Sequence, residues 1–186
     1  MKKRIILENI SESSKLFTIS QVQTEFEANL KERGLRPVTL RFYNNIMEAF
    51  YKFKDYKEPV SNITESTISD YINYCRNIRN NSQNTVSTNI RGLRTVLYFA
   101  MKKGYMDSFK IHVPTPDLTP KTTYSIKEVQ RLLNKPNLQH CGFSEYIAYI
   151  AVNIFVFTGC RVSTAINIKI ADIDLDNNLI YYRHTK

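Results

Sequence analysis

Apolar residues recur at spacings of three and four positions in four successive segments between residues 18 and 104. This spacing places them on one face of an α-helix, and a glycine, a proline or an Asn–Ser turn follows each segment. Four helices with short connections predict a compact all-α domain over residues 18–110. The positions expected to be buried are Ile19, Val22, Phe26 and Leu30; Leu40, Tyr43, Met47, Phe50 and Phe53; Ile68, Tyr71, Ile72 and Cys75; and Val86, Ile90, Leu93, Leu97 and Ala100.

The beginnings of these helices are marked as well. Pro37 suits the first turn of the second helix, where a missing backbone N–H breaks no helical hydrogen bond. Thr64 is the expected N-cap of the third helix, without a full capping box, and either Ser82 or Asn84 is expected to cap the fourth. Residues 1–17 precede the first helical pattern and are predicted to be an N-terminal tail.

A proline-rich segment separates this domain from a second one. Residues 112–120 contain three prolines, which is too many for a helix interior or a central strand. We therefore predict an extended linker over residues 111–122, followed by a second domain over residues 123–186.

The second domain opens with a capping box, Ser125 to Glu128, at the start of a short helix. Residues 146–158 are apolar on all sides, so we expect them to form the central helix of a second core. An Asn177–Asn178 turn leads into a predicted strand over residues 179–184. Because no later segment could pair with that strand, we expect this domain to be incomplete and the sequence to be an N-terminal fragment.

The charge distribution favours a polyanionic partner. The net charge is +9, and no Asp or Glu occurs between Asp70 and Asp107. A basic helix face of this kind is often only solvated, but such faces normally include Glu for pairing with Lys or Arg. The basic residues in the acid-free stretch are Arg76, Arg79, Arg91, Arg94, Lys102 and Lys103.

The cysteines and the apolar segments exclude several classes of protein. Cys75, Cys141 and Cys160 have neither zinc-ligand spacing nor an even number, so we expect free thiols in a reducing cytoplasm, with no metal and no cofactor. The longest apolar run, residues 147–157, is interrupted by Asn153 and is far shorter than the ~18 residues that a membrane span needs. The sequence thus predicts a soluble cytoplasmic protein without membrane contact.

The segment around Arg161 carries the most specific signal. An arginine near a helix C-terminus can simply complement the helix dipole. Here, however, Thr158-Gly-Cys-Arg-Val-Ser163 is followed by Asp172-Ile-Asp174, and together they resemble the tyrosine recombinase (phage integrase) pattern T-G-x-R-[IV]-S followed by D-I-D. The helical domain is similar to the SAM-like core-binding domain of that family, over Val38-Thr39-Leu40 and over Asn89 to Arg94.

The resemblance implies a fold and a chemistry. The expected fold is mainly α, a four-helix SAM-like core-binding domain followed by a truncated α+β catalytic domain with a short β-hairpin sheet. Arg161 would grip the scissile phosphate, and Lys186, on the turn of a hairpin, would protonate the leaving 5′ oxygen. Thr164 stands where the family has an acid that orients the arginine. Either another acid such as Asp172 replaces it or the grip is weaker.

The resemblance also implies what this chain lacks. The family's H-x-x-R motif and its nucleophilic tyrosine lie further along than these residues, and Tyr181 and Tyr182 are expected to be packing residues. We therefore expect an integrase that binds DNA but does not cleave it alone. Its expected partners are a double-stranded recombination site and further protomers of the same recombinase. The expected DNA contacts, on the second and fourth helices, are Arg36, Thr39, Arg41, Thr85, Thr88, Arg91 and Arg94.

Two other interpretations fit the same sequence. One is a non-catalytic DNA-binding regulator derived from an integrase. The other is a helical module whose basic face binds an acidic protein. A salt titration separates the last of these from DNA binding, because binding through ~6 to 10 phosphates weakens steeply with salt.

Overall fold

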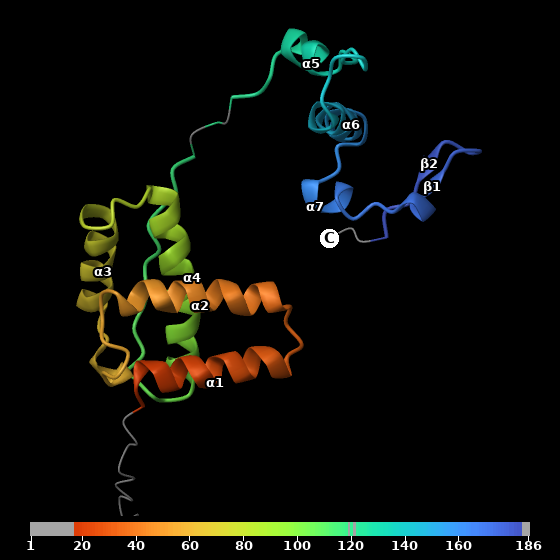
Figure 1. Cartoon of the computed structure of the whole chain (residues 1–186). Coiled ribbons are helices and arrows are strands. Elements are labelled where there is room, and N and C mark those ends of the chain that lie inside the picture. The colour runs from red at the N-terminus through yellow and green to blue at the C-terminus, as the bar shows by residue number, and fades with distance from the viewer. Residues whose placement is uncertain (1–16, 119, 121, 184–186) are drawn as a thin grey trace, which may run out of the picture. The chain divides into compact units, whose positions relative to one another are not determined.

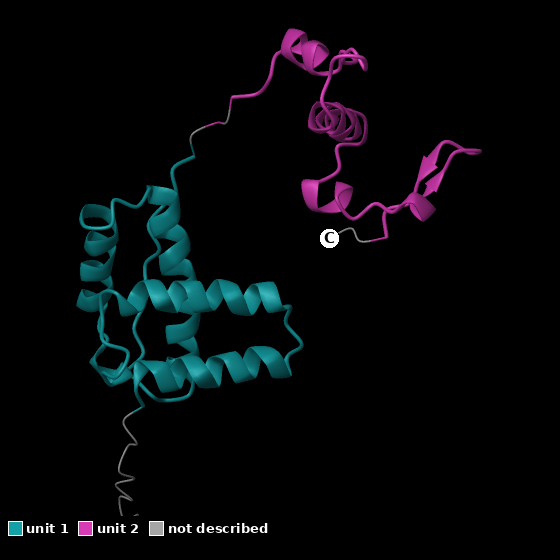
Figure 2. Cartoon of the chain, in the orientation of Figure 1, with its two compact units in different colours: residues 1–119 teal, residues 120–186 magenta. Residues whose placement is uncertain are grey.

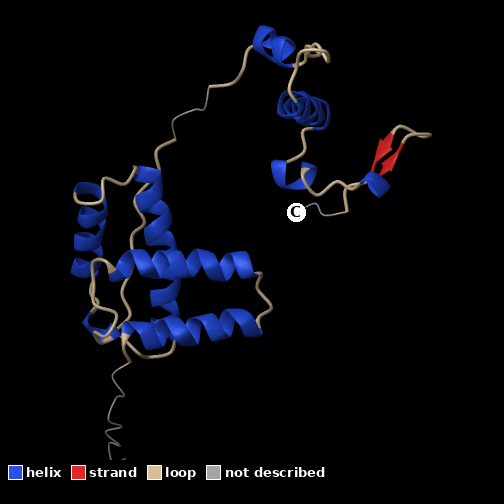
Figure 3. Cartoon of the chain, viewed as in Figure 1, coloured by secondary structure: helices blue, strands red, loops and turns tan. Residues whose placement is uncertain are grey.

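The computed structural model describes residues 17–118, 120 and 122–183 (Figure 1). The chain forms two compact units, residues 1–119 and residues 120–186 (Figure 2). The secondary structure is mainly helical, with two short strands in the second unit (Figure 3). This confirms the predicted fold class.

The first unit contains the four predicted helices. They are α1 (Ile19–Glu32), α2 (Pro37–Tyr51), α3 (Glu65–Asn77) and α4 (Gln83–Lys102), with a 3-10 turn, η1 (Val60–Asn62), before α3. Pro37 is the first residue of α2, and Ser82, one of the two candidates, caps α4 through its side chain. The cap of α3 differs from the prediction, because the Thr67 hydroxyl accepts from the Thr64 amide and completes a capping box.

The core of this unit lies where α1, α2 and α3 meet α4. Phe26 of α1 contacts Tyr43 of α2 edge to face and Phe99 of α4 at a ring-centre distance of 5.5 Å. Phe50 and Tyr71 join α2 to α3, also edge to face. Most of the positions predicted to be buried are buried. Leu40, Tyr43, Phe53 and Ile72 are only partly buried and pack around the edge of the core.

Helices α2 and α4 pack directly on each other at Gly92. A Cβ atom added at Gly92 would lie 2.8 Å from Cγ1 of Ile46, inside the contact distance that two carbon atoms tolerate. Ile46 is itself buried. The absence of a side chain at Gly92 therefore sets how closely these two helices approach.

The C-terminal end of α4 is fastened to α1. The Glu25 carboxylate accepts hydrogen bonds from the Lys103 ammonium, at 2.9 Å, and from the Tyr105 hydroxyl, at 2.8 Å. These two bonds lower the pKa of the Glu25 carboxyl below its ordinary value. The Tyr105 ring also stacks on Phe17, just before α1 begins.

The second unit is built from short elements. It contains α5 (Ile126–Leu132), α6 (Phe143–Thr158), α7 (Val162–Ala165), the 3-10 turn η2 (Ile170–Asp172), β1 (Ile173–Asp174) and β2 (Leu179–Ile180). The predicted capping box of Ser125 and Glu128 opens α5. Among the helices that the structure describes, none is both long enough and apolar enough to cross a bilayer.

Two predictions for the second unit are wrong. The strand expected to lack a partner pairs antiparallel with β1, with Ile173 opposite Ile180, because Asn178 adopts a left-handed conformation and reverses the chain. Helix α6 was expected to be the buried centre of a core. It begins earlier, at Phe143, and none of its residues is buried. The neighbouring elements in the described part of this unit are too short to cover its apolar sides.

Candidate functional site

Arg161 lies at a sharp junction between α6 and α7. Gly159 ends α6 with a left-handed backbone, φ 62°, and its amide donates to the Phe155 carbonyl. Two residues later Arg161 caps α7, and its own carbonyl accepts from the amides of Thr164 and Ala165 at 2.8 and 3.0 Å. The backbone is thus held on both sides, while the guanidinium stays exposed.

A hollow of about 390 Å³ lies beside this junction. It is lined by Thr158, Gly159, Cys160, Arg161, Thr164 and Tyr182. It therefore offers the Arg161 guanidinium, a charged donor suited to an anion such as a phosphate, whereas the Thr158 hydroxyl already donates to the Ile154 carbonyl.

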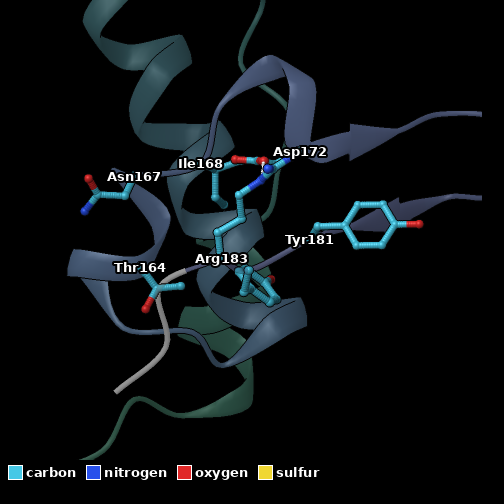
Figure 4. Close-up of a pocket in the computed structure, with 7 residues that line it drawn as sticks. Thr164, Asn167, Ile168, Asp172, Tyr181 and Arg183 are labelled. Carbon is cyan, nitrogen blue, oxygen red and sulfur yellow. Dashed lines mark hydrogen bonds and ion pairs between the residues drawn. The ribbon is translucent and has the colours of Figure 1, made fainter.

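Asp172 does not take the place of the missing acid beside Arg161. Its carboxylate accepts from the Lys169 amide at 3.0 Å and from Nε of Arg183, and these bonds lower the pKa of the Asp172 carboxyl. Figure 4 shows the Arg183 side chain directed at Asp172. Among the described residues no ion pair joins Arg161 to an acid, so Thr164 leaves Arg161 without an orienting carboxylate here.

Asp172 instead fastens the hairpin to η2. It is 3% exposed and is the one buried residue in the described part of the second unit. Its carbonyl also accepts from the Tyr181 amide at 2.8 Å. Arg183, the partner of Asp172, is not among the site residues that the sequence predicts. The register of the hairpin brings residues 181–183 back beside Asp172, and two-residue strands carry no sequence pattern that determines this register.

The two tyrosines of the second unit, Tyr181 and Tyr182, differ in how far they are buried. Tyr182 is partly buried and lines the hollow beside Arg161, in keeping with the packing role expected of it. Tyr181 is 53% exposed, so it is not a packing residue. Its ring points away from the Asp172–Arg183 pair (Figure 4). Lys186 lies outside the described residues.

The predicted contacts on α2 surround its first turn. Arg36 is the N-cap residue and makes no side-chain cap bond, and both Arg36 and Arg41 are exposed. Thr39 is partly buried, and its amide donates to the Arg36 carbonyl at 2.9 Å. The two arginines are therefore free to reach a ligand, whereas Thr39 is less accessible.

An exposed stripe of polar residues runs along α4, opposite its buried face. The stripe consists of Asn84, Thr88, Arg91, Thr95, Tyr98 and Lys102, with Thr85 beside it. All are exposed, and their spacing of three and four keeps them on one side of the helix. Sequence reasoning identified Thr85, Thr88 and Arg91 but missed Thr95 and Tyr98, which the same spacing would have indicated.

The threonine hydroxyls of the stripe are already used as donors. Thr88 donates to the Asn84 carbonyl at 2.9 Å and Thr95 donates to the Arg91 carbonyl at 3.1 Å. Toward a ligand they can therefore act as acceptors or offer their methyl groups. Arg94 lies beside the stripe and is half-buried, with its guanidinium 6.0 Å from the centre of the Tyr98 ring.

No acid of the described residues pairs with the arginines of this surface. The ion pairs in the first unit join Lys54 to Glu58 and Lys103 to Glu25. Because Arg36, Arg41, Arg91 and Arg94 take part in neither, their charge is available to a polyanion. Within residues 17–118, 120 and 122–183, no group of three His, Cys, Asp or Glu side chains is arranged so that it could hold a metal ion.

Comparison with known proteins gives a consistent result. Residues 19–113 match the sequence profile of the family described as phage integrase SAM-like domain. No curated protein matches the chain in sequence.

Solved structures of an integrase from the transposon Tn1549 resemble the chain. One, in complex with a circular intermediate DNA, has a TM-score of 0.69 at 18% sequence identity, over 90% of this chain and 53% of that one. Another, in complex with transposon right end DNA, has a TM-score of 0.67 at 19% identity, over 91% of this chain and 53% of that one. The chain therefore has the same fold as these structures and spans about half of their length.

Proposed function

The chain belongs to the family of phage integrase SAM-like domains, and from this premise we propose that it binds a double-stranded recombination site in the cytoplasm as part of a tyrosine site-specific recombinase. The observation that carries this proposal is the exposed stripe on α4, which has an arginine at its centre and no acid along it. Arginine, asparagine and threonine are residues that contact phosphates and base edges in DNA.

The arginines at the start of α2 support the same proposal. Arg36 and Arg41 are exposed at a helix N-terminus, where free backbone N–H groups also favour a phosphate. We propose that α2 and α4 lie against the DNA together, since Gly92 holds the two helices in close contact. Further protomers of the same recombinase would occupy the partner half-site.

In the second unit, we assign Arg161 to the scissile phosphate. Its planar fork can hold two phosphate oxygens and stabilise the charge that develops on them. A tyrosine other than Tyr181 and Tyr182 gives up its hydroxyl proton to the solvent as its oxygen attacks the phosphorus. The bond from phosphorus to the 5′ oxygen breaks, and that oxygen takes a proton from Lys186. The products are a phosphotyrosyl ester and a free 5′ hydroxyl. Because Thr164 carries no charge, Arg161 is expected to be oriented less firmly than with a carboxylate beside it.

A salt titration with the 186-residue chain tests DNA binding. The probe is a labelled duplex obtained by selection from a randomised library, and the readout is fluorescence anisotropy. If the chain neutralises ~6 to 10 phosphates, the logarithm of the binding constant falls with log salt at a slope of about −5 to −9. A slope near zero, or no binding to any duplex, would favour the acidic-protein partner instead.

A nicked duplex that carries the selected site tests the assignment of the chemistry. We expect the chain to bind this substrate without forming a covalent protein–DNA species on a denaturing gel, because neither Tyr181 nor Tyr182 is assigned as the nucleophile. A covalent band that disappears in the Tyr181→Phe or Tyr182→Phe variant would overturn that assignment.

A further inference from the structure

The residues after α4 form a strap along the first unit, at the place where the sequence predicts the start of an extended linker. We use strap for residues 109–116. Ile111 is 3% exposed and belongs to the core of the first unit, and Phe109 and Val113 pack against that core from the edge. Alternate residues of the strap therefore face inward, as in an extended segment with one buried side.

Two hydrogen bonds from α4 hold the strap. The Ile111 amide donates to the Tyr98 hydroxyl at 3.2 Å, and the Gln83 side-chain amide donates to the Thr115 carbonyl at 2.8 Å. Arg76, at the end of α3, donates in turn to Oε1 of the Gln83 side chain at 3.1 Å. Because Gln83 and Tyr98 lie toward opposite ends of α4, the strap runs back beside that helix, as Figure 1 shows.

The outward positions of the strap are basic. Lys110 and His112 flank Ile111 in the chain, and both are exposed. The hydrogen bond from the Ile111 amide joins the strap to Tyr98, which is part of the exposed stripe. The Arg94 guanidinium lies over the ring of this tyrosine. Lys110 and His112 are therefore the chain neighbours of a residue bonded to the stripe, while Asp107 and Asp117, the nearest acids in the sequence, lie outside the strap.

We infer that the strap is part of the DNA-binding surface, with Lys110 and His112 as contacts to the sugar–phosphate backbone beside the groove that α4 enters. This inference rests on the proposed function. Lys110 supplies a charge, His112 supplies a hydrogen-bond donor, and the bonds from Gln83 and Tyr98 fix both residues relative to α4 before DNA binds. Pre-ordered contacts of this kind lose less conformational entropy on binding than contacts from a free linker.

The test compares Lys110→Gln with a matched control, Lys31→Gln, in the full chain. Both variants remove one exposed positive charge from the first unit, but Lys31 lies on α1, away from the strap in the sequence. We expect Lys110→Gln to make the slope of log binding constant against log salt less steep by about 0.9, the value for one phosphate contact. The control should leave the slope unchanged.

A second variant, Gln83→Ala, tests whether the strap must be held in place. It removes the bond to Thr115 and leaves the basic residues intact. We expect weaker DNA binding, and a smaller loss from Lys110→Gln in this background than in the wild type, because a released strap contacts DNA less often. Equal slopes for Lys110→Gln, Lys31→Gln and the wild-type chain would overturn the inference. Failure of the wild-type chain to bind DNA would instead overturn the proposed function.

Discussion

Replacing Gly92 with valine is expected to lower the free energy of unfolding of the first unit by about 3 kcal/mol, the upper part of the range for overpacking a core. The cause is local and specific. The first added carbon would lie 2.8 Å from Cγ1 of Ile46 and 3.3 Å from both Cδ1 and Cγ2 of that residue. Since Ile46 is 4% exposed, its side chain cannot turn out into solvent. Urea unfolding followed by circular dichroism measures the change.

If the clash with Ile46 causes the loss of stability, a second substitution at Ile46 should restore part of it. Ile46→Ala alone should destabilise the unit by about 2–5 kcal/mol, as for other large-to-small core substitutions. It removes all three of the atoms that clash with the new side chain. The double variant should therefore be more stable than the sum of the two losses predicts, by at least about 1 kcal/mol. Additive losses would contradict the proposed contact.

Gly142→Val, at a glycine of the second unit, is the control for this substitution. Gly142 has an ordinary backbone conformation, φ −73°, and a Cβ atom there meets nothing within 4 Å. This variant should leave the unfolding of the first unit within about 0.5 kcal/mol of the wild type, as is usual for a surface substitution. An equal loss at Gly142 and Gly92 would show that glycine replacement as such, and not the α2–α4 contact, is responsible.

Gly92 also shows why helix positions could be predicted and helix packing could not. The bounds of α1 and α4 follow from local signals, such as the Thr18 cap, the Ser82 cap and the left-handed glycines at 34 and 104. The approach of α4 to α2 depends on a residue pair far apart in the sequence. No local pattern identifies Ile46 as the partner of Gly92.

The strap and α6 show a second limit of sequence reasoning. Three prolines correctly exclude a helix after residue 111, but they do not say whether the extended chain is free, and Ile111 is in fact buried. In α6 the apolar composition predicts burial, while its actual exposure depends on which elements surround it. Amino-acid composition thus predicts the backbone conformation of a segment more reliably than it predicts which residues that segment contacts.

For the candidate site, the motif located Arg161 but not the partner of Asp172. The Thr-Gly-Cys-Arg pattern indicates a helix end followed by an arginine, and both are present. The sequence leaves Asp172 as one candidate for the acid missing at Thr164. The structure pairs it with Arg183, across the hairpin. Cross-strand partners depend on register, which the sequence did not determine for strands this short.

Arg91→Ala is expected to weaken binding to the selected DNA site by about 5- to 150-fold, which corresponds to the ~1–3 kcal/mol of a side chain that reads a base edge. Arg91 lies at the centre of the exposed stripe on α4, between Thr88 and Thr95, and pairs with no described acid. Its guanidinium can form two parallel hydrogen bonds to the edge of a guanine. Binding to a panel of duplexes, each with one base pair changed, measures both affinity and preference.

The panel distinguishes two roles for Arg91. If it reads a base, Arg91→Ala removes the preference at one base pair and weakens random DNA much less than the selected site. If it contacts only a phosphate, every duplex weakens alike, and Arg91→Lys, which keeps the charge, restores most of the binding. Arg33→Ala is the control, because Arg33 is exposed at the end of α1, outside the stripe. A loss no larger at Arg91 than at Arg33 would mean that α4 does not present this stripe to DNA.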